Sequence, residues 1–457
     1  MNAHDSFRRT GEFIKNSPTL KMVSMGILIL ILLIPKSMVS DLTYERQSRR
    51  EGVVKEINDK WGGKQEVTGP FITVPFKTYY KEFEALKYHI NHLHILPETL
   101  NIQGKVDPNI RYRGIFEAVL YNTQLNISGH FSMPDLENSG IDPENVLWDQ
   151  ASMNLGITDM RGIQENINIT FNEQTYPVNP GVKRPDLTES GVSCQVPFLR
   201  TQQEQPFSLD VNLNGSQELK FVPVGKETNV NVSSPWQSPS FQGAFLPTKR
   251  NITEDGFDAS WKVLHLNRNF PQMWQDDQFR VYPSAFGLEL LITNDIYQKS
   301  TRISKYAIMF IVFTFTALFF SEIISRRRMH PIQYLLIGLA IVLFYVLLLS
   351  ISEHMNFNLA YIISSLSITA MISGYCLGIT GNRTFTSVVG SLLVVLYTYL
   401  YVVLQLEDYS LLMGSIGLFM ILGTIMYITR KIDWYALGGS EPPPQPSSRT
   451  SSRGGGE

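Results

Sequence analysis

Residues 303–429 carry five apolar runs joined by connections of only four to six residues. A helix that crosses the hydrocarbon core of a bilayer needs about 20 apolar residues, and each run has about that length. Connections this short place consecutive helices antiparallel to one another. The pattern therefore predicts a C-terminal bundle of five transmembrane helices, over residues 303–324, 331–351, 357–378, 384–405 and 410–429.

Another apolar run lies close to the N-terminus, over Met22–Val39. Its compact apolar core is compatible with a cleaved signal peptide or with a permanent membrane anchor. A long basic segment precedes the run, and Met38–Ser40 is a poor small-x-small cleavage site. We therefore expect an uncleaved transmembrane anchor over residues 22–40, after a cytoplasmic segment over residues 1–21.

Lysine and arginine are distributed unevenly around these predicted spans. They occur in the N-terminal segment and in alternate connections, at 1–21, 326–328, 383 and 430–431, and are absent from the connections 352–356 and 406–409. Because basic loops stay in the cytoplasm, this bias predicts that both termini are cytoplasmic and that residues 41–302 are extracytoplasmic. The tail 430–457 is rich in Pro, Ser and Gly and is predicted to be a disordered cytoplasmic tail.

The polar stretch 41–302 changes its pattern at Trp61–Gly63. Before that point Asp41–Lys60 has helical spacing, with Asp41 as its predicted N-cap. After it, eight short runs alternate apolar and polar residues, separated by turn signals such as Thr68-Gly-Pro and Asp107-Pro-Asn. The pattern predicts a large β-sandwich-like domain in an α+β membrane protein, with strands at 71–76, 89–96, 118–126, 166–171, 207–213, 229–232, 260–266 and 286–292.

The chain offers little catalytic or metal chemistry. Its two cysteines, Cys194 and Cys376, fall in different predicted compartments, which argues against a disulfide framework. Neither a phosphate-binding loop nor a nucleophile elbow is present, and a net charge of −2 without a basic face argues against nucleic acid. In a strand, His92 and His94 share a face while His89 points away, but no third ligand is recognisable nearby. We expect no metal and no cofactor.

Acidic residues in the predicted bundle are more informative. Glu322 lies one turn before Arg326, so a local ion pair is expected, with a proton path as the alternative. The two outer connections carry Glu353, His354, Glu407 and Asp408. We expect these four residues to form one polar cluster that seats the extracytoplasmic domain on the bundle. The alternative is that they are loop charges excluded from lipid.

Distinctive short segments run from about Ile34 to Tyr435, among them Thr68–Phe76 (TGPFITVPF), Ser234–Pro247 (SPWQSPSFQGAFLP), Leu349–His354 (LSISEH) and Leu404–Tyr409 (LQLEDY). In this order they resemble the inner-membrane CreD family of bacterial cell-envelope integrity proteins. Only the Pro/Ser/Gly tail departs clearly. The resemblance implies the Gram-negative inner (plasma) membrane, a periplasmic β-domain, control by a two-component system, and an influence on tolerance to colicins and β-lactams. It implies no enzymatic activity.

Three functions remain open at this stage. The leading hypothesis is a non-enzymatic envelope protein whose periplasmic domain binds an envelope component or a partner protein. The alternative is a small-solute or ion permease that uses the helix bundle, and an enzyme acting on lipid or cell-wall substrates comes third. A permease needs polar groups at mid-depth, whereas a binding protein needs an exposed groove or apolar patch on the β-domain. The lipid bilayer is the one partner that the sequence itself predicts.

Overall fold

The computed structural model describes residues 18–83, 85–136, 140–184, 186–199, 202–292, 296–325, 329–406 and 409–430. The chain divides into two compact units. One, the β-domain, comprises residues 48–294, and the other, the bundle unit, comprises residues 1–47 and 295–457. The boundaries expected from the sequence were 41 and 302. The predicted tail and most of the predicted cytoplasmic N-terminal segment lie outside the described residues.

The first helix, α2 (Pro18–Trp61), is continuous over 44 residues and contains both the apolar run and the polar segment after it. The expected new start at Asp41 was wrong, because the helix continues through Pro35 and Asp41. The Thr43 hydroxyl donates to the Val39 carbonyl, one turn earlier in the same unbroken helix. The predicted end is confirmed. Gly62 has φ +142°, and a Cβ there would approach the Asn214 carbonyl oxygen to 2.8 Å.

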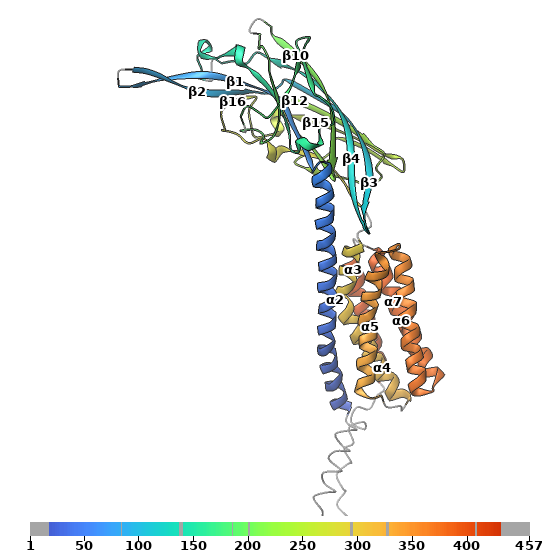
Figure 1. Cartoon of the computed structure of the whole chain (residues 1–457). Coiled ribbons are helices and arrows are strands. Elements are labelled where there is room, and N and C mark those ends of the chain that lie inside the picture. Colours follow the sequence, from blue (N-terminus) through green and yellow to red (C-terminus); the bar gives the residue numbers. More distant parts are fainter. Residues whose placement is uncertain are drawn as a thin grey trace, which may run out of the picture. The chain divides into compact units, whose positions relative to one another are not determined.

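The β-domain contains two sheets in the described residues (Figure 1). The first sheet has nine strands: β1 (Gln65–Glu82), β2 (Ala85–Ile95), β5 (Ser152–Ile157), β8 (Asn179–Pro180), β9 (Gly191–Gln195), β11 (Glu218–Val222), β13 (Pro239–Gly243), β16 (Met273–Gln275) and β17 (Phe286–Leu290). The second sheet has eight: β3 (Thr99–Arg113), β4 (Phe116–Ser132), β6 (Asn168–Phe171), β7 (Gln174–Pro177), β10 (Glu204–Ser216), β12 (Glu227–Ser234), β14 (Lys249–Thr253) and β15 (Gly256–Leu264).

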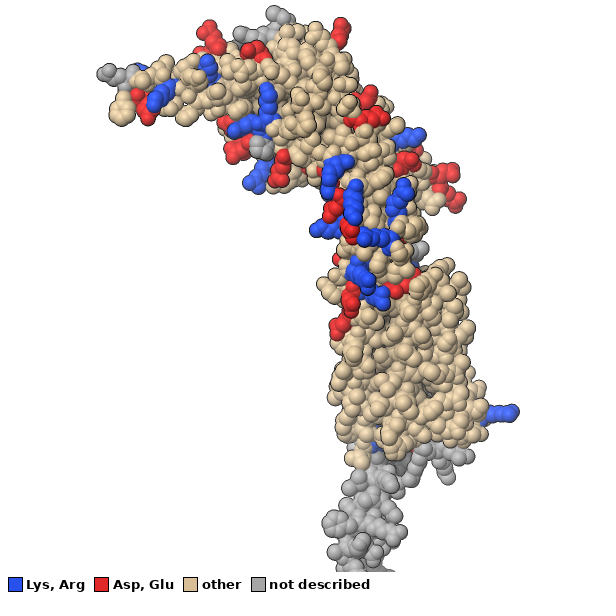
Figure 2. Space-filling view, viewed as in Figure 1, with Lys and Arg blue, Asp and Glu red and all other residues tan. Residues whose placement is uncertain are grey.

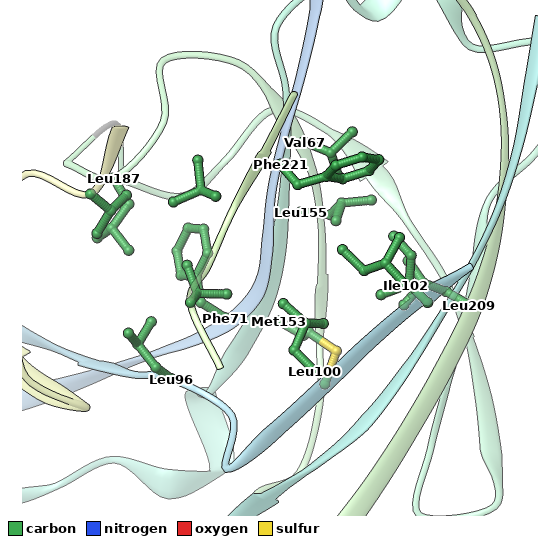
Figure 3. Packing of buried hydrophobic residues seen from close by; sticks show 14 of the residues in the cluster. Val67, Phe71, Leu96, Leu100, Ile102, Met153, Leu155, Leu187, Leu209 and Phe221 are labelled. Atoms are coloured by element: carbon green, nitrogen blue, oxygen red, sulfur yellow. The ribbon is translucent and has the colours of Figure 1, made fainter. Parts of the chain in front are cut away.

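One hydrophobic core joins the two sheets. Val67, Leu155 and Phe221 from the first sheet and Ile102 and Leu209 from the second belong to the same cluster (Figure 3). Each fully buried side chain of this size contributes roughly 1.5–3 kcal/mol of transfer free energy. In the second sheet one face is buried and the other is wet, as the alternating pattern of β3 shows. The eight runs expected from the sequence all overlap strands, which confirms a large β-sheet domain.

Two predicted turns instead lie inside strands. Asp107-Pro-Asn is part of β3, which pairs with β12 only up to Lys105 and with β4 along its whole length. At Pro108 the missing N–H therefore faces an open edge and removes no ladder hydrogen bond. Thr68-Gly-Pro forms a bulge in β1, where the register with β5 shifts between Thr68 and Phe71.

The bundle unit contains α3 (Ile296–Lys305), α4 (Ala307–Ser325), α5 (Pro331–Ser352), α6 (Phe357–Thr380), α7 (Arg383–Gln405) and α8 (Ser410–Thr429). In the described part of the chain, α2, α5, α6 and α7 are long and apolar enough to cross a membrane. The span expected at 303–324 is instead a pair, α3 and α4, bent by 44°, which gives a fifth. The span over α8 stays a prediction. Figure 2 shows charged side chains over the β-domain and largely uncharged sides on the helices.

Candidate functional site

Glu322, near the end of α4, is buried and bound by three groups. The Lys21 ammonium of α2 forms an ion pair with its carboxylate. The Tyr334 hydroxyl donates to Oε2 at 2.9 Å, and the Met329 backbone N–H donates to Oε1 at 3.1 Å. The ion pair expected from the sequence was with Arg326, which lies outside the described residues. The structure shows a partner that the sequence did not predict, Lys21, which is 301 residues away in the chain.

Glu353, the C-cap of α5, is bound in a similar way at the other end of the unit. The Tyr297 hydroxyl of α3 donates to Oε1 at 3.0 Å, and Arg46 Nη1 of α2 lies 3.8 Å from Oε2. The carboxylate of Glu353 is largely buried, with 9% of its side chain exposed. Lys21 and Arg46 are 25 residues apart, roughly 38 Å along an α-helix. The two ion pairs therefore lie near the two headgroup levels of a bilayer whose hydrocarbon core is about 30 Å thick.

Between these ion pairs α2 packs directly on the bundle. Leu32 is fully buried, and a Cβ at Gly338 of α5 would overlap it. The Ser40 and Ser304 hydroxyls lie 3.0 Å apart, which joins α2 to α3. Small residues at helix contacts allow this close approach within a membrane. The α2 segment up to Gln47 is thus a packed member of the bundle as well as an anchor.

The predicted polar cluster is only partly visible. Glu353 contacts Arg46, one of the basic residues that follow the anchor, and His354 is exposed beside it. Glu407 and Asp408 lie outside the described residues. The described residues that bind Glu353 all belong to the bundle unit. Its expected role in seating the β-domain therefore stays a prediction.

The histidines of β2 have distinct surroundings. His89 is exposed and stacks on Tyr80, with ring centroids 4.6 Å apart. His94 is buried, with Nδ1 3.0 Å from the Thr73 hydroxyl and Nε2 3.5 Å from the Asp186 carboxylate. His92 Nδ1 lies 3.7 Å from Asp276 Oδ1. His92 and His94 therefore do share one environment, as their strand spacing predicts.

A loop between β8 and β9 closes over these two histidines. Arg184 Nε donates to Asp186 at 3.2 Å, and Arg184 Nη2 lies 3.8 Å from Asp276. Among the described residues, no group of three or more His, Cys, Asp or Glu side chains is arranged to hold a metal ion. The arrangement instead holds the loop against the sheet through charged groups. Burial lowers the pKa of His94 to about 4, although Asp186 opposes the shift.

We expect acid to destabilise the β-domain through His94. The folded state keeps this imidazole neutral down to about pH 4, whereas the unfolded chain protonates it below about 6.5. The stability that depends on neutral His94 is therefore fully present above pH 6.5. As the pH falls toward 4, the free energy of unfolding decreases by about 3 kcal/mol in total. Thermal unfolding of the full chain between pH 7 and 4 measures this loss. His94→Gln should flatten the dependence and His89→Gln, its exposed control, should not. Equal slopes in all three proteins would contradict the assignment.

A two-stranded arm projects from the β-domain (Figure 1). β1 and β2 pair from Ile72–Ile95 out to Glu82–Ala85, but β5 pairs with β1 only as far as Thr73 and β16 pairs with β2 only over Leu93–Ile95. We call residues 77–90 the β1–β2 arm. Its described side chains, those of residues 77–83 and 85–90, are mostly exposed, and Phe83 is completely exposed.

The arm has two different faces, because directly opposed residues of paired strands point to the same side. One face, which we call the aromatic face, carries Lys77, Tyr79, Lys81, Leu86, Tyr88 and Ile90. The Tyr79 and Tyr88 rings lie 5.9 Å apart, and the Lys77 ammonium lies 5.0 Å from the Tyr88 ring. Among the described residues, this face carries two cations and no acid. The opposite face carries the Tyr80–His89 stack and the Lys87–Glu82 ion pair.

The β1–β2 arm was not predicted as a site from the sequence. Its apolar and polar residues alternate as they do in any strand with one buried face. Alternation alone therefore does not reveal that both faces of the arm stay exposed. The available signal was the concentration of tyrosine and lysine in 77–90, which holds three of each in 14 residues.

The fold and these sites define a class of protein: an integral membrane protein in which a large β-sheet domain is inserted between the first apolar helix and a set of later ones. A family profile described as "Inner membrane protein CreD" matches residues 17–435. The inner membrane protein CreD of Escherichia coli (strain K12) is 32% identical over 427 residues, which cover 91% of this chain and 93% of that protein. The chain belongs to the CreD family of inner membrane proteins.

Proposed function

We propose that the chain supports the integrity of the cell envelope without catalysing a reaction. Its β-domain lies on the periplasmic side and binds an anionic envelope component or partner protein through the aromatic face of the β1–β2 arm. The observation that supports this proposal is the exposure of that face. Tyr79, Leu86, Tyr88 and Ile90 are each at least 44% exposed, on a ribbon that no third strand covers in the described part of the β-domain.

An isolated two-stranded ribbon is marginally stable in water, and exposed apolar side chains add nothing to its own core. Such side chains contribute free energy only when a partner removes them from water. Tyrosine is enriched in binding surfaces, because it buries a large area and loses little side-chain entropy. Lys77 and Lys81 on the same face form no ion pair with a described residue. They favour a negatively charged partner and increase the rate of encounter.

The proposal is tested by crosslinking in living cells. A photoreactive side chain at Tyr79 or Ile90 should capture a defined product, because both positions lie on the aromatic face. The same group at Leu246, which is 71% exposed elsewhere on the β-domain, is the matched control. A product that forms equally at all three positions would contradict specific binding by the arm.

Substitution of the tyrosines tests the link to the envelope. Tyr79→Ser with Tyr88→Ser should remove the captured product and sensitise cells to envelope stress as strongly as loss of the whole protein. Tyr80→Ser changes the same chemistry on the opposite face and should leave both readouts unchanged. If cells with the double variant tolerate envelope stress as well as wild-type cells do, the arm is not needed for the function.

A small-solute or ion permease is the second candidate function. It is supported by Thr314, Tyr345, Ser364 and Tyr397 of the bundle, whose buried hydroxyls make no hydrogen bond to another described residue. Buried hydroxyls are normally satisfied, so these groups suit ordered water or a small polar solute. A permease would keep its function when the arm is substituted, whereas an envelope-binding protein would lose it. The arm variants therefore separate the two candidates.

A further inference from the structure

An apolar groove of about 860 Å³ lies between α2 and α5 in the bundle unit. Pro35, Met38 and Leu42 form one wall, and Leu336, Leu339 and Leu343 form the other. Both helices are apolar enough to span a membrane, so the groove opens on the hydrocarbon region. Its volume lies in the range of pockets that hold small ligands, roughly 300–1,000 Å³.

Two carboxylates lie at one end of this groove. Asp41 and Glu45 line it and follow the apolar run of α2, which places them at the headgroup level. They are four residues apart and hence neighbours on one helix face, where like charges repel. Arg46, the next residue, is paired with Glu353. Within the described part of the chain, Asp41 and Glu45 have no ion pair of their own.

We propose that this groove binds a phospholipid with a primary ammonium headgroup, such as phosphatidylethanolamine. An acyl chain lies along the apolar walls, where it removes Leu336, Leu339 and Leu343 from contact with bulk lipid. The ammonium group lies between the Asp41 and Glu45 carboxylates, and it offsets their mutual repulsion. The occupant must be amphiphilic, because the walls are apolar and the two acids are at one end only. It must be cationic at that end, so an anionic headgroup such as phosphatidylglycerol is disfavoured.

The experiment titrates the purified full chain in mild detergent with phosphatidylethanolamine or phosphatidylglycerol of matched acyl chains. Native mass spectrometry measures how much lipid stays bound. We expect one phosphatidylethanolamine to be retained in preference to phosphatidylglycerol. Asp41→Asn with Glu45→Gln should reduce that preference roughly three- to five-fold while leaving the groove open. Leu339→Trp should fill the groove and reduce retention of both lipids, whereas Leu366→Trp, at an exposed position on α6, should not.

Three results would overturn the proposal. Equal retention of the two lipids by the wild-type chain would mean that the headgroup is not recognised. An unchanged preference in the Asp41→Asn, Glu45→Gln variant would show that these carboxylates do not bind the headgroup. This variant alters only exposed side chains, so we expect it to fold. A wild-type dimer that dissociates in Leu339→Trp would assign the groove to a second copy of the chain.

Discussion

Lys21→Met should destabilise the membrane-embedded unit strongly, by about 3–5 kcal/mol, because it leaves Glu322 buried without its cation. Glu322 is 8% exposed at its side chain and lies within a predicted span, so little water is available to replace the lost charge. The Tyr334 hydroxyl and Met329 N–H would remain as its donors. Thermal unfolding of the purified protein in detergent, together with the amount that accumulates in membranes, measures the effect.

A second substitution distinguishes the ion pair from general damage to α2. Glu322→Gln in the Lys21→Met background removes the unpaired charge. Its amide oxygen can accept from the Met329 N–H, and its amide NH2 can donate to the Tyr334 hydroxyl. We expect this double variant to recover much of the lost stability. Arg383→Met, which removes a cation exposed at the start of α7, is the matched control and should cost little. A double variant as unstable as Lys21→Met alone would show that the lysine acts through its packing.

Reporters that are active only in the periplasm should be active when fused after residues 150, 354 and 407, and inactive after residues 328, 382 and 440. The expected contrast is all or none, because each fusion site is either translocated or retained. Its physical reason is the distribution of Lys and Arg, which are retained on the cytoplasmic side of the membrane. Reporter activity in intact cells, normalised to the amount of each fusion, measures it.

Each fusion tests one hairpin independently, so a wrong assignment would be located as well as detected. The sites 354 and 382 bracket α6, and 382 and 407 bracket α7. Activity after residue 328 would invert the bundle relative to the α2 anchor and overturn the proposed topology. Activity after residue 440 would show that α8 does not cross the membrane, and would leave the remaining assignments intact.

The two ion pairs hold the N-terminal helix α2 at a fixed height against the bundle helices. Lys21 and Arg46 are bound near opposite headgroup levels, so α2 is restrained along its axis at two points. Axial restraint matters because an apolar helix alone is free to shift in lipid at modest cost. The groove beside Asp41 has walls on both α2 and α5, so a shift of α2 along its axis would alter it.

Local patterns in the sequence were enough for the general architecture. Apolar runs of membrane-spanning length predicted the helices, since a bilayer accepts only segments whose backbone groups are satisfied internally. Alternation of apolar and polar residues predicted the β-domain, because side chains of a strand point to its two faces in turn. Proline and glycine were less reliable, as Pro108 and Gly69 lie within strands where an open edge or a bulge tolerates them.

Contacts between distant parts of the chain could not be predicted in this way. Glu322 has a basic residue four positions later in sequence, yet Lys21 binds it from the other end of the chain. Asp186 and Asp276 meet the histidines of β2 only because a loop and a strand end fold over them. The exposure of both faces of residues 77–90 follows from where β5 and β16 stop pairing. Periodicity, length and charge bias act locally and so determine the elements and their class, whereas tertiary packing alone decides which charges become partners and which surfaces stay uncovered.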